Sequence, residues 1–198
     1  MDKAIVHLKK CDPVLATIIE RIGPYRVEYG EPTLHSLAEA IVYQQLNGKA
    51  AVTIFKRFTD LAGNPVTPQG ILKLSEEQMR AAGLSKQKLS YLRDLAEKAQ
   101  AGIVDFARLP DLSDEEVIRH LTQIKGIGVW TAQMFLIFSL GRLDVFPHDD
   151  LGVRAAIRNL YALDDLPDRE TSHRIAMPWR PYASVASWYC WRSLEFKD

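Results

Sequence analysis

The sequence predicts an all-α fold of about nine or ten helices joined by short loops. Residues that cap helices precede apolar stretches with helical spacing from one end of the chain to the other. No stretch alternates apolar and polar residues with the two-residue period of a half-buried strand. The Asn47-Gly48 pair, a common hairpin turn between strands, lies between two helical patterns instead. These observations favour helices packed on helices over any sheet architecture.

Capping residues mark where the predicted helices begin. Asp12-Pro13 supplies a capping carboxylate followed by a proline suited to the first helical turn. Ser75 and Ser113 each stand three residues before a Gln or Glu, which is the spacing of a capping box. The stretch 129–140 is apolar on nearly every side, as in a buried central helix. The helices expected from caps and apolar spacing cover residues 14–22, 34–46, 87–100, 129–140, 151–161, 171–179 and 182–194.

Composition limits the class of protein. Among 198 residues, 47% are hydrophobic, no apolar run has the length of a membrane span, and the first residues carry no signal-peptide core. We therefore expect an intracellular protein with no membrane contact. The 25 basic and 25 acidic residues cancel, which argues against a globally basic nucleic-acid binder but allows a local basic face.

Two cysteines, Cys11 and Cys190, are too few for a disulfide framework or a four-cysteine cluster. We therefore expect a reducing compartment, no iron–sulfur cluster and no required cofactor.

The most informative segment covers residues 113–140. Two helical patterns flank Lys125, Gly126, Ile127 and Gly128. Glycines permit positive φ and leave the backbone uncovered, so the amides that open the second helix can meet a phosphate. Ile127, between the two glycines, would anchor the hairpin in the core. A tight turn between two helices with no ligand is the alternative interpretation.

The wider sequence resembles a known superfamily. The stretch LTQIKGIGVWTA is followed, after a buried helix, by LDVFPHDDLGVR, an arrangement similar to that of the helix-hairpin-helix (HhH-GPD) DNA glycosylases. Within that superfamily, GVWTAQMFLIF and VYQQLNGKAA resemble the alkylpurine branch, the 3-methyladenine DNA glycosylase II group. The resemblance extends from about Thr33 to the C-terminus.

This resemblance implies that Asp150 is the catalytic carboxylate, since the superfamily's aspartate stands just before the following helix. A carboxylate stabilises the cationic sugar formed as the base leaves, and it can activate water. Asp150 is also suited to cap the helix at 151–161, and a cap would hold the carboxylate in place. Asp149 is the competing carboxylate, expected to serve as a cap or a partner. His148 is expected to lie at the surface.

The resemblance also implies the residues of the base pocket. Trp130 and Trp188 match tryptophans that line it, and indole faces attract a cationic alkylated purine. Both could instead be core residues, and Trp179 and Trp191 are expected to be purely structural. Met134 and Leu151 stand where larger members carry tyrosines, so this pocket is expected to be less aromatic. Trp130 also occupies the position at which bifunctional members carry a lysine that forms a Schiff base. We therefore expect an enzyme without lyase activity.

The DNA-binding residues implied by the resemblance come from two loops. Leu46 would fill the space left by a flipped base, with Gln44 or Gln45 touching the orphan base. A partly buried leucine at a helix end is the alternative for Leu46. The second loop is the hairpin, with the contact residues Lys125, Gly126, Ile127 and Gly128. Relatives also suggest a monovalent cation there, held by the main-chain carbonyls of Thr122, Ile124 and Ile127.

The resemblance predicts two helical lobes, one of residues 33–141 and the other of 1–32 with 142–198, with the active cleft between them. The expected function is excision of alkylated purines from double-stranded DNA by a monomer, in the cytoplasm or nucleoid of a bacterium or in the nucleus of a eukaryote. Three lesions remain open, namely 3-methyladenine, 7-methylguanine and etheno-adenine. A non-catalytic binder of DNA structures and a helical protein-interaction module are the alternatives.

Overall fold

A computed structural model describes residues 1–196, which form twelve α-helices and two short 3₁₀ helices. Within this part of the chain there is no strand, so the all-α prediction is confirmed. None of the described helices combines the length and the apolar character needed to cross a membrane. The chain divides into two compact units, Met1–Glu28 with Gly141–Asp198, and Tyr29–Leu140. They are called here the terminal unit and the central unit.

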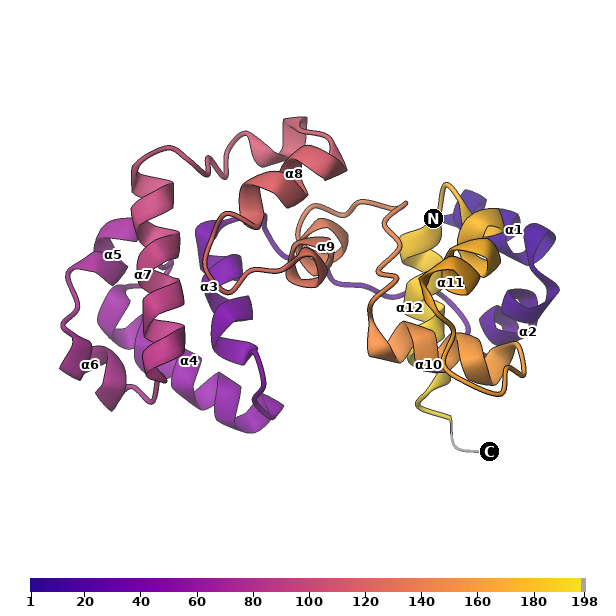
Figure 1. Ribbon diagram of the computed structural model, residues 1–198, viewed down its shortest axis with the longest axis horizontal. Helices are drawn as coiled ribbons and strands as arrows, with labels where there is room; N and C mark the ends of the chain where they lie inside the picture. Colours follow the sequence, from indigo (N-terminus) through magenta and orange to yellow (C-terminus); the bar gives the residue numbers. More distant parts are fainter. Residues whose placement is uncertain (197–198) are drawn as a thin grey trace. The chain divides into compact units, whose positions relative to one another are not determined.

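The terminal unit combines helices from the N-terminal and the C-terminal segments of the chain. In Figure 1 the indigo helices of the N-terminal segment lie beside the orange and yellow helices of the C-terminal segment. Contacts join α1 to α2, α2 to α12, and α10 to α12. The helices of this unit are α1 (Asp2–Cys11), α2 (Pro13–Ile22), α10 (Leu151–Leu160), α11 (Arg169–Ala176) and α12 (Ala183–Ser193), with a 3₁₀ turn, η2 (Met177–Trp179), before α12.

A buried carboxylate ties the core of the terminal unit together. Asp12 caps α2 as predicted, accepting hydrogen bonds from the Val14 and Leu15 amides. Its other carboxylate oxygen accepts from the Tyr161 hydroxyl at 2.5 Å and from Trp179 Nε1 at 2.8 Å. Burial and the neighbouring Asp12 raise the pKa of Tyr161, so the phenol stays protonated and remains a donor. Trp179 is fully buried, in agreement with the structural role expected for it.

The central unit is a bundle in which α7 lies against several other helices (Figure 1). Contacts join α7 to α3, α5 and α6, while α8 packs on α9. The helices of this unit are α3 (Leu34–Tyr43), α4 (Gly48–Ala62), α5 (Pro68–Leu72), α6 (Glu76–Ala81), α7 (Lys86–Gln100), α8 (Asp114–Leu121) and α9 (Val129–Phe138), with a 3₁₀ turn, η1 (Leu109–Asp111). The capping boxes at Ser75 and Ser113 are both present.

Several helix boundaries differ from the prediction, and two of them have clear local reasons. The helix expected over 34–46 ends at Tyr43, because Gln44 has an extended ψ of 130° and Gln45 a positive φ of 56°. Apolar spacing does not reveal this break. The helix expected over 171–179 begins earlier, at Arg169, because the Asp168 carboxylate caps it by accepting from the Thr171 amide at 2.8 Å.

Candidate functional site

Asp150 lies where α10 begins, in the terminal unit, and its carboxylate is fixed by two donors. Oδ1 accepts a hydrogen bond from the Val153 amide at 2.8 Å and another from Trp191 Nε1 at 2.8 Å. The predicted helix cap is therefore confirmed. Asp150 is only 8% exposed, so its carboxylate is held in a fixed orientation in a largely dehydrated position.

Trp191 is a functional candidate that the sequence reasoning missed, since it was expected to be purely structural. Its indole N–H donates to Asp150 across 41 positions of the chain, so no local pattern could have indicated the pair. Gly152 leaves room for this contact. A Cβ there would lie 3.0 Å from Trp191 Cδ1 and 3.1 Å from Asp150 Oδ1.

The residues just before Asp150 differ from the prediction. His148 was expected at the surface but is buried, at 9% exposed. The reason is packing, because its ring lies 4.9 Å from the ring of His173 on α11. Asp149 is exposed and does not cap α10; its carboxylate lies 3.2 Å from His148 Nε2. Burial, and secondarily the neighbouring His148, lower the pKa of His173, so this imidazole is neutral at pH 7.

Trp188 and Leu151, two expected base-pocket residues, also belong to the terminal unit. Trp188 is half-buried, and its ring forms edge-to-face contacts with Tyr25 and Tyr189, each at 4.9 Å between centroids. The Arg192 guanidinium lies 5.8 Å from the Trp188 ring centre, so this ring already attracts one cation. Leu151 is 65% exposed in the first turn of α10.

The hairpin lies in the central unit and is held from behind by α7. Its turn is closed by a hydrogen bond of 3.1 Å from the Ile127 amide to the Ile124 carbonyl, and Gly126 has a φ of 80°. Any Cβ at Gly126 would overlap the ring of Tyr91. Ile127 is buried, as expected for the residue that anchors the hairpin in the core.

Asp94, on α7, is a second anchor that the sequence did not indicate. Its Oδ2 accepts from the Lys125 amide at 2.8 Å and from Lys98 Nζ at 2.5 Å. Burial by itself would raise the pKa of Asp94, but these donors outweigh burial and hold the pKa below its usual value. Because the main chain of Lys125 is fixed, its largely exposed side chain projects from a rigid base.

The second helix of the hairpin, α9, begins at an open end. Gly128 is its N-cap residue, and no side chain among the described residues caps it. A Cβ added at Gly128 would meet no atom within 4 Å. The first N–H groups of a helix lack intrahelical acceptors and attract anions, so this end is suited to a phosphate.

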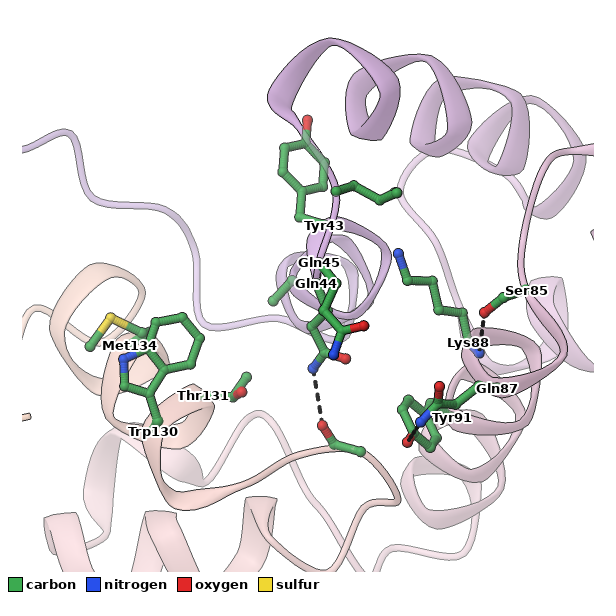
Figure 2. Close-up of a pocket in the computed structure, with 13 residues that line it drawn as sticks. Tyr43, Gln44, Gln45, Ser85, Gln87, Lys88, Tyr91, Trp130, Thr131 and Met134 are labelled. Carbon is green, nitrogen blue, oxygen red and sulfur yellow. Dashed lines mark hydrogen bonds between the residues drawn. The ribbon is translucent and has the colours of Figure 1, made fainter. Parts of the chain in front are cut away.

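A cavity of about 850 Å³ lies in the central unit beside the hairpin. Figure 2 shows Trp130 and Met134 on one side of it and Lys88 and Tyr91 on the other. Trp130 is 45% exposed, so it is not a core tryptophan. The lining residues are Ala40, Tyr43, Gln44, Gln45, Leu46, Ser85, Gln87, Lys88, Tyr91, Gly126, Trp130, Thr131 and Met134.

The loop expected to fill the space of a flipped base borders the same cavity. Leu46 is 37% exposed and lies in a turn after α3. Gln45 is exposed on this turn. Gln44, one of the two residues expected to touch the orphan base, donates its side-chain amide to the Gly126 carbonyl at 3.0 Å (Figure 2). The structure thus brings the Leu46 loop and the hairpin together.

The carbonyls of Thr122, Ile124 and Ile127, expected to hold a cation, lie on this hairpin segment. The Ile124 carbonyl accepts one hydrogen bond, from the Ile127 amide, and a carbonyl oxygen has two lone pairs. Carbonyl oxygens are ligands that hard cations prefer, so the chemistry of these groups is compatible with the expected site.

Comparisons with known proteins agree on one family. The family described as "HhH-GPD superfamily base excision DNA repair protein" matches residues 38–181. DNA-3-methyladenine glycosylase 1 of Schizosaccharomyces pombe is 38% identical over 205 residues, covering 100% of this chain and 90% of the relative. The putative DNA-3-methyladenine glycosylase YfjP of Bacillus subtilis is 34% identical, covering 80% of this chain and 58% of the relative.

Solved structures show the same likeness over nearly the whole chain. The S. pombe 3-methyladenine DNA glycosylase Mag1 in complex with abasic DNA has a TM-score of 0.86 at 38% identity, covering 98% of this chain and 97% of that one. A DNA-3-methyladenine glycosidase from Bacillus halodurans has a TM-score of 0.84 at 37% identity, covering 94% and 86% of the two chains.

Proposed function

Because the chain belongs to the HhH-GPD superfamily of base excision DNA repair proteins, we propose that it is a monofunctional DNA glycosylase that excises alkylated purines. The full-length likeness to DNA-3-methyladenine glycosylases supports this substrate class. One structural observation supports the proposal most directly. It is the buried Asp150 carboxylate, held at the start of α10 by the Val153 amide and by Trp191 Nε1.

The reaction breaks the bond between C1′ of deoxyribose and the purine nitrogen. A purine nucleotide methylated at N3 or N7 is cationic, so the base takes the bonding electron pair and leaves as a neutral molecule without needing a strong acid. Asp150 then stabilises the oxocarbenium-like sugar. At ~4 Å and an effective dielectric constant near 20, the attraction between the two charges is about 4 kcal/mol. Water adds its hydroxide to C1′, and its proton passes to the carboxylate or to solvent.

Aromatic side chains provide the electron-rich faces that a cationic base requires. We assign this role to Trp130, which is exposed at the first turn of α9, and to Trp188. Each indole face contributes ~0.5–2 kcal/mol toward a cation. The Arg192 guanidinium near Trp188 competes with the base for that ring. Met134 and Leu151 contribute apolar surface rather than further rings.

The residue at position 130 also determines what remains after excision. An indole cannot form the Schiff base that precedes strand cleavage. Lys125, the nearest lysine in sequence, has its ammonium 3.8 Å from Asp94 Oδ1 and its main chain fixed by the same carboxylate. The product is therefore an intact abasic site.

Backbone groups and one lysine hold the DNA strand. We propose that the open start of α9 at Gly128 binds a phosphate, with Lys125 adding charge. Leu46 fills the space of the flipped base, and Gln45 touches the orphan base. Because these contacts are local, they do not need a globally basic protein.

A monovalent cation held by the Thr122, Ile124 and Ile127 carbonyls would add positive charge at the same hairpin. If it binds there, replacing K⁺ by a bulky organic cation at constant ionic strength weakens binding to abasic-analogue DNA. Equal affinities in the two salts would exclude the cation.

Chromatography of bases released from methylated DNA tests the proposed function. The wild-type protein should release 3-methyladenine, and the same assay should rank 7-methylguanine and etheno-adenine beside it. Tight binding to abasic-analogue DNA without release of any base would instead identify a non-catalytic DNA-structure binder. Absence of DNA affinity would support an interaction module.

A further inference from the structure

Two tight turns of the central unit are joined by a single side chain. The wedge turn (Tyr43–Leu46) and the hairpin turn (Ile124–Ile127) are each closed by a hydrogen bond from the last amide to the first carbonyl, at 3.2 and 3.1 Å. Gln44, in the wedge turn, donates its side-chain amide to the Gly126 carbonyl of the hairpin turn at 3.0 Å (Figure 2). The two segments are 82 positions apart in sequence, so this contact exists only in the folded unit.

The two turns share a positive φ at the third residue but not the strain that it causes. In each, the third residue has a positive φ, 80° at Gly126 and 56° at Gln45. Glycine adopts this conformation freely, whereas a residue with a Cβ is disfavoured there. The backbone of the wedge turn is therefore strained at Gln45, and contacts with other residues must stabilise this conformation.

Two contacts hold the chain just before the strained residue. Gln44, just before Gln45, is tied to the hairpin as described. Lys88, on α7, donates its ammonium to the Val42 carbonyl in the last turn of α3 at 2.6 Å. Leu46 extends from this braced turn with 37% of its surface exposed. An apolar side chain is thus presented to solvent on a turn whose preceding backbone is fixed at Val42 and Gln44.

We propose that Gln44 is a positioning residue that couples the wedge turn to the hairpin turn and so holds Leu46 ready before DNA binds. The inference rests on the proposed glycosylase function. When a DNA strand binds the hairpin turn, Leu46 is then already held in position. Base flipping therefore costs little additional conformational entropy in the protein. Gln44 acts through the turn, whereas Leu46 and Gln45 meet the DNA.

The test compares Gln44→Met with the wild type. Methionine keeps the length of the side chain and removes the donor. Base flipping is followed by the fluorescence of 2-aminopurine placed next to the lesion, and excision is measured in single turnover at saturating enzyme. We expect both rates to fall by about tenfold, as the loss of one hydrogen bond implies, while affinity for undamaged DNA changes less than twofold. Unchanged flipping and excision would overturn the proposal.

Two further variants separate positioning from general damage to the protein. Gln69→Met, at an exposed site on α5, makes the same chemical change away from both turns and should leave all rates unchanged. In a Gln45→Gly background the turn is no longer strained, so adding Gln44→Met should lower flipping by less than about threefold. An equal loss with and without Gln45→Gly would show that Gln44 does not act through the turn.

Hydrogen exchange separates this proposal from the proposed function. The Leu46 amide closes the wedge turn, so Gln44→Met should speed its exchange in the free protein by about tenfold. This measurement needs neither DNA nor activity. Faster exchange in a protein that excises no base would support the coupling and overturn the glycosylase assignment; unchanged exchange would overturn the coupling alone.

Discussion

Trp191 Nε1 donates a hydrogen bond of 2.8 Å to Asp150 Oδ1, the oxygen that also caps α10. The carboxylate is therefore oriented by two elements, the first turn of α10 and the indole of α12. An interaction of this kind restricts rotation of the carboxylate and so fixes where its charge lies. In a reaction that depends on electrostatic stabilisation of a cationic sugar, that placement contributes to the rate.

Replacing Trp191 by Phe should slow excision more than it weakens binding. The indole hydrogen bond goes to a carboxylate, and bonds to charged groups are the stronger ones, so single-turnover excision should fall by about tenfold or more. Affinity for abasic-analogue DNA should change little. As a control, Trp179→Phe removes the same type of bond, to Asp12, and should lower the melting temperature without changing the rate per folded molecule.

Replacing Asp150 by Asn keeps the shape of the side chain and removes its charge. Excision should fall by orders of magnitude, while binding to lesion-containing DNA largely survives, because the carboxylate acts on the transition state. Asp149→Asn is the matched control and should matter much less, since Asp149 is exposed and contacts His148. Near-normal excision by Asp150→Asn would transfer the catalytic role to Asp149 or His148.

The two hairpin glycines should respond differently to substitution. Gly128→Leu should fold normally because a Cβ there meets open space, yet it covers the start of α9 and should weaken binding to all DNA sequences alike. Gly126→Ala should destabilise the protein, because its φ is 80° and the added Cβ overlaps Tyr91. Thermal melting combined with a binding titration separates the two effects; a Gly128→Leu protein with unchanged affinity would exclude the phosphate role.

The wild-type protein should form no covalent adduct with DNA. Borohydride reduces a Schiff base between enzyme and sugar to a stable adduct, and position 130 offers no amine for one. Gel electrophoresis after borohydride treatment should show neither an adduct nor strand cleavage. Robust trapping would overturn the monofunctional assignment and direct attention to Lys125.

The stability of the terminal unit should decrease in mild acid through His173. Its pKa in the folded protein is lowered, by burial first and by His148 second, so the unfolded chain binds the proton more readily. The contribution of neutral His173 to the free energy of unfolding is therefore complete above the pKa of an unfolded histidine, about 6.5, and is lost as the pH falls below that value. Urea titrations between pH 5 and 8 should show a slope of at most about 1.4 kcal/mol per pH unit, reduced in His173→Phe. An identical slope in the variant would assign the effect to other groups.

The sequence by itself determined the all-α fold, most helix starts, the hairpin at Gly126–Gly128 and Asp150 as a helix cap. These features depend on neighbours within a few positions, where caps, apolar spacing and glycines act directly. Only the tertiary structure decided that Trp191 holds Asp150, that Asp94 and Tyr91 support the hairpin, that His148 is buried, and that Gln44 binds Gly126. Each of these features depends on residues that packing brings together from distant segments of the chain. The sequence around a hydrogen-bonding side chain does not indicate which distant residue will be its partner.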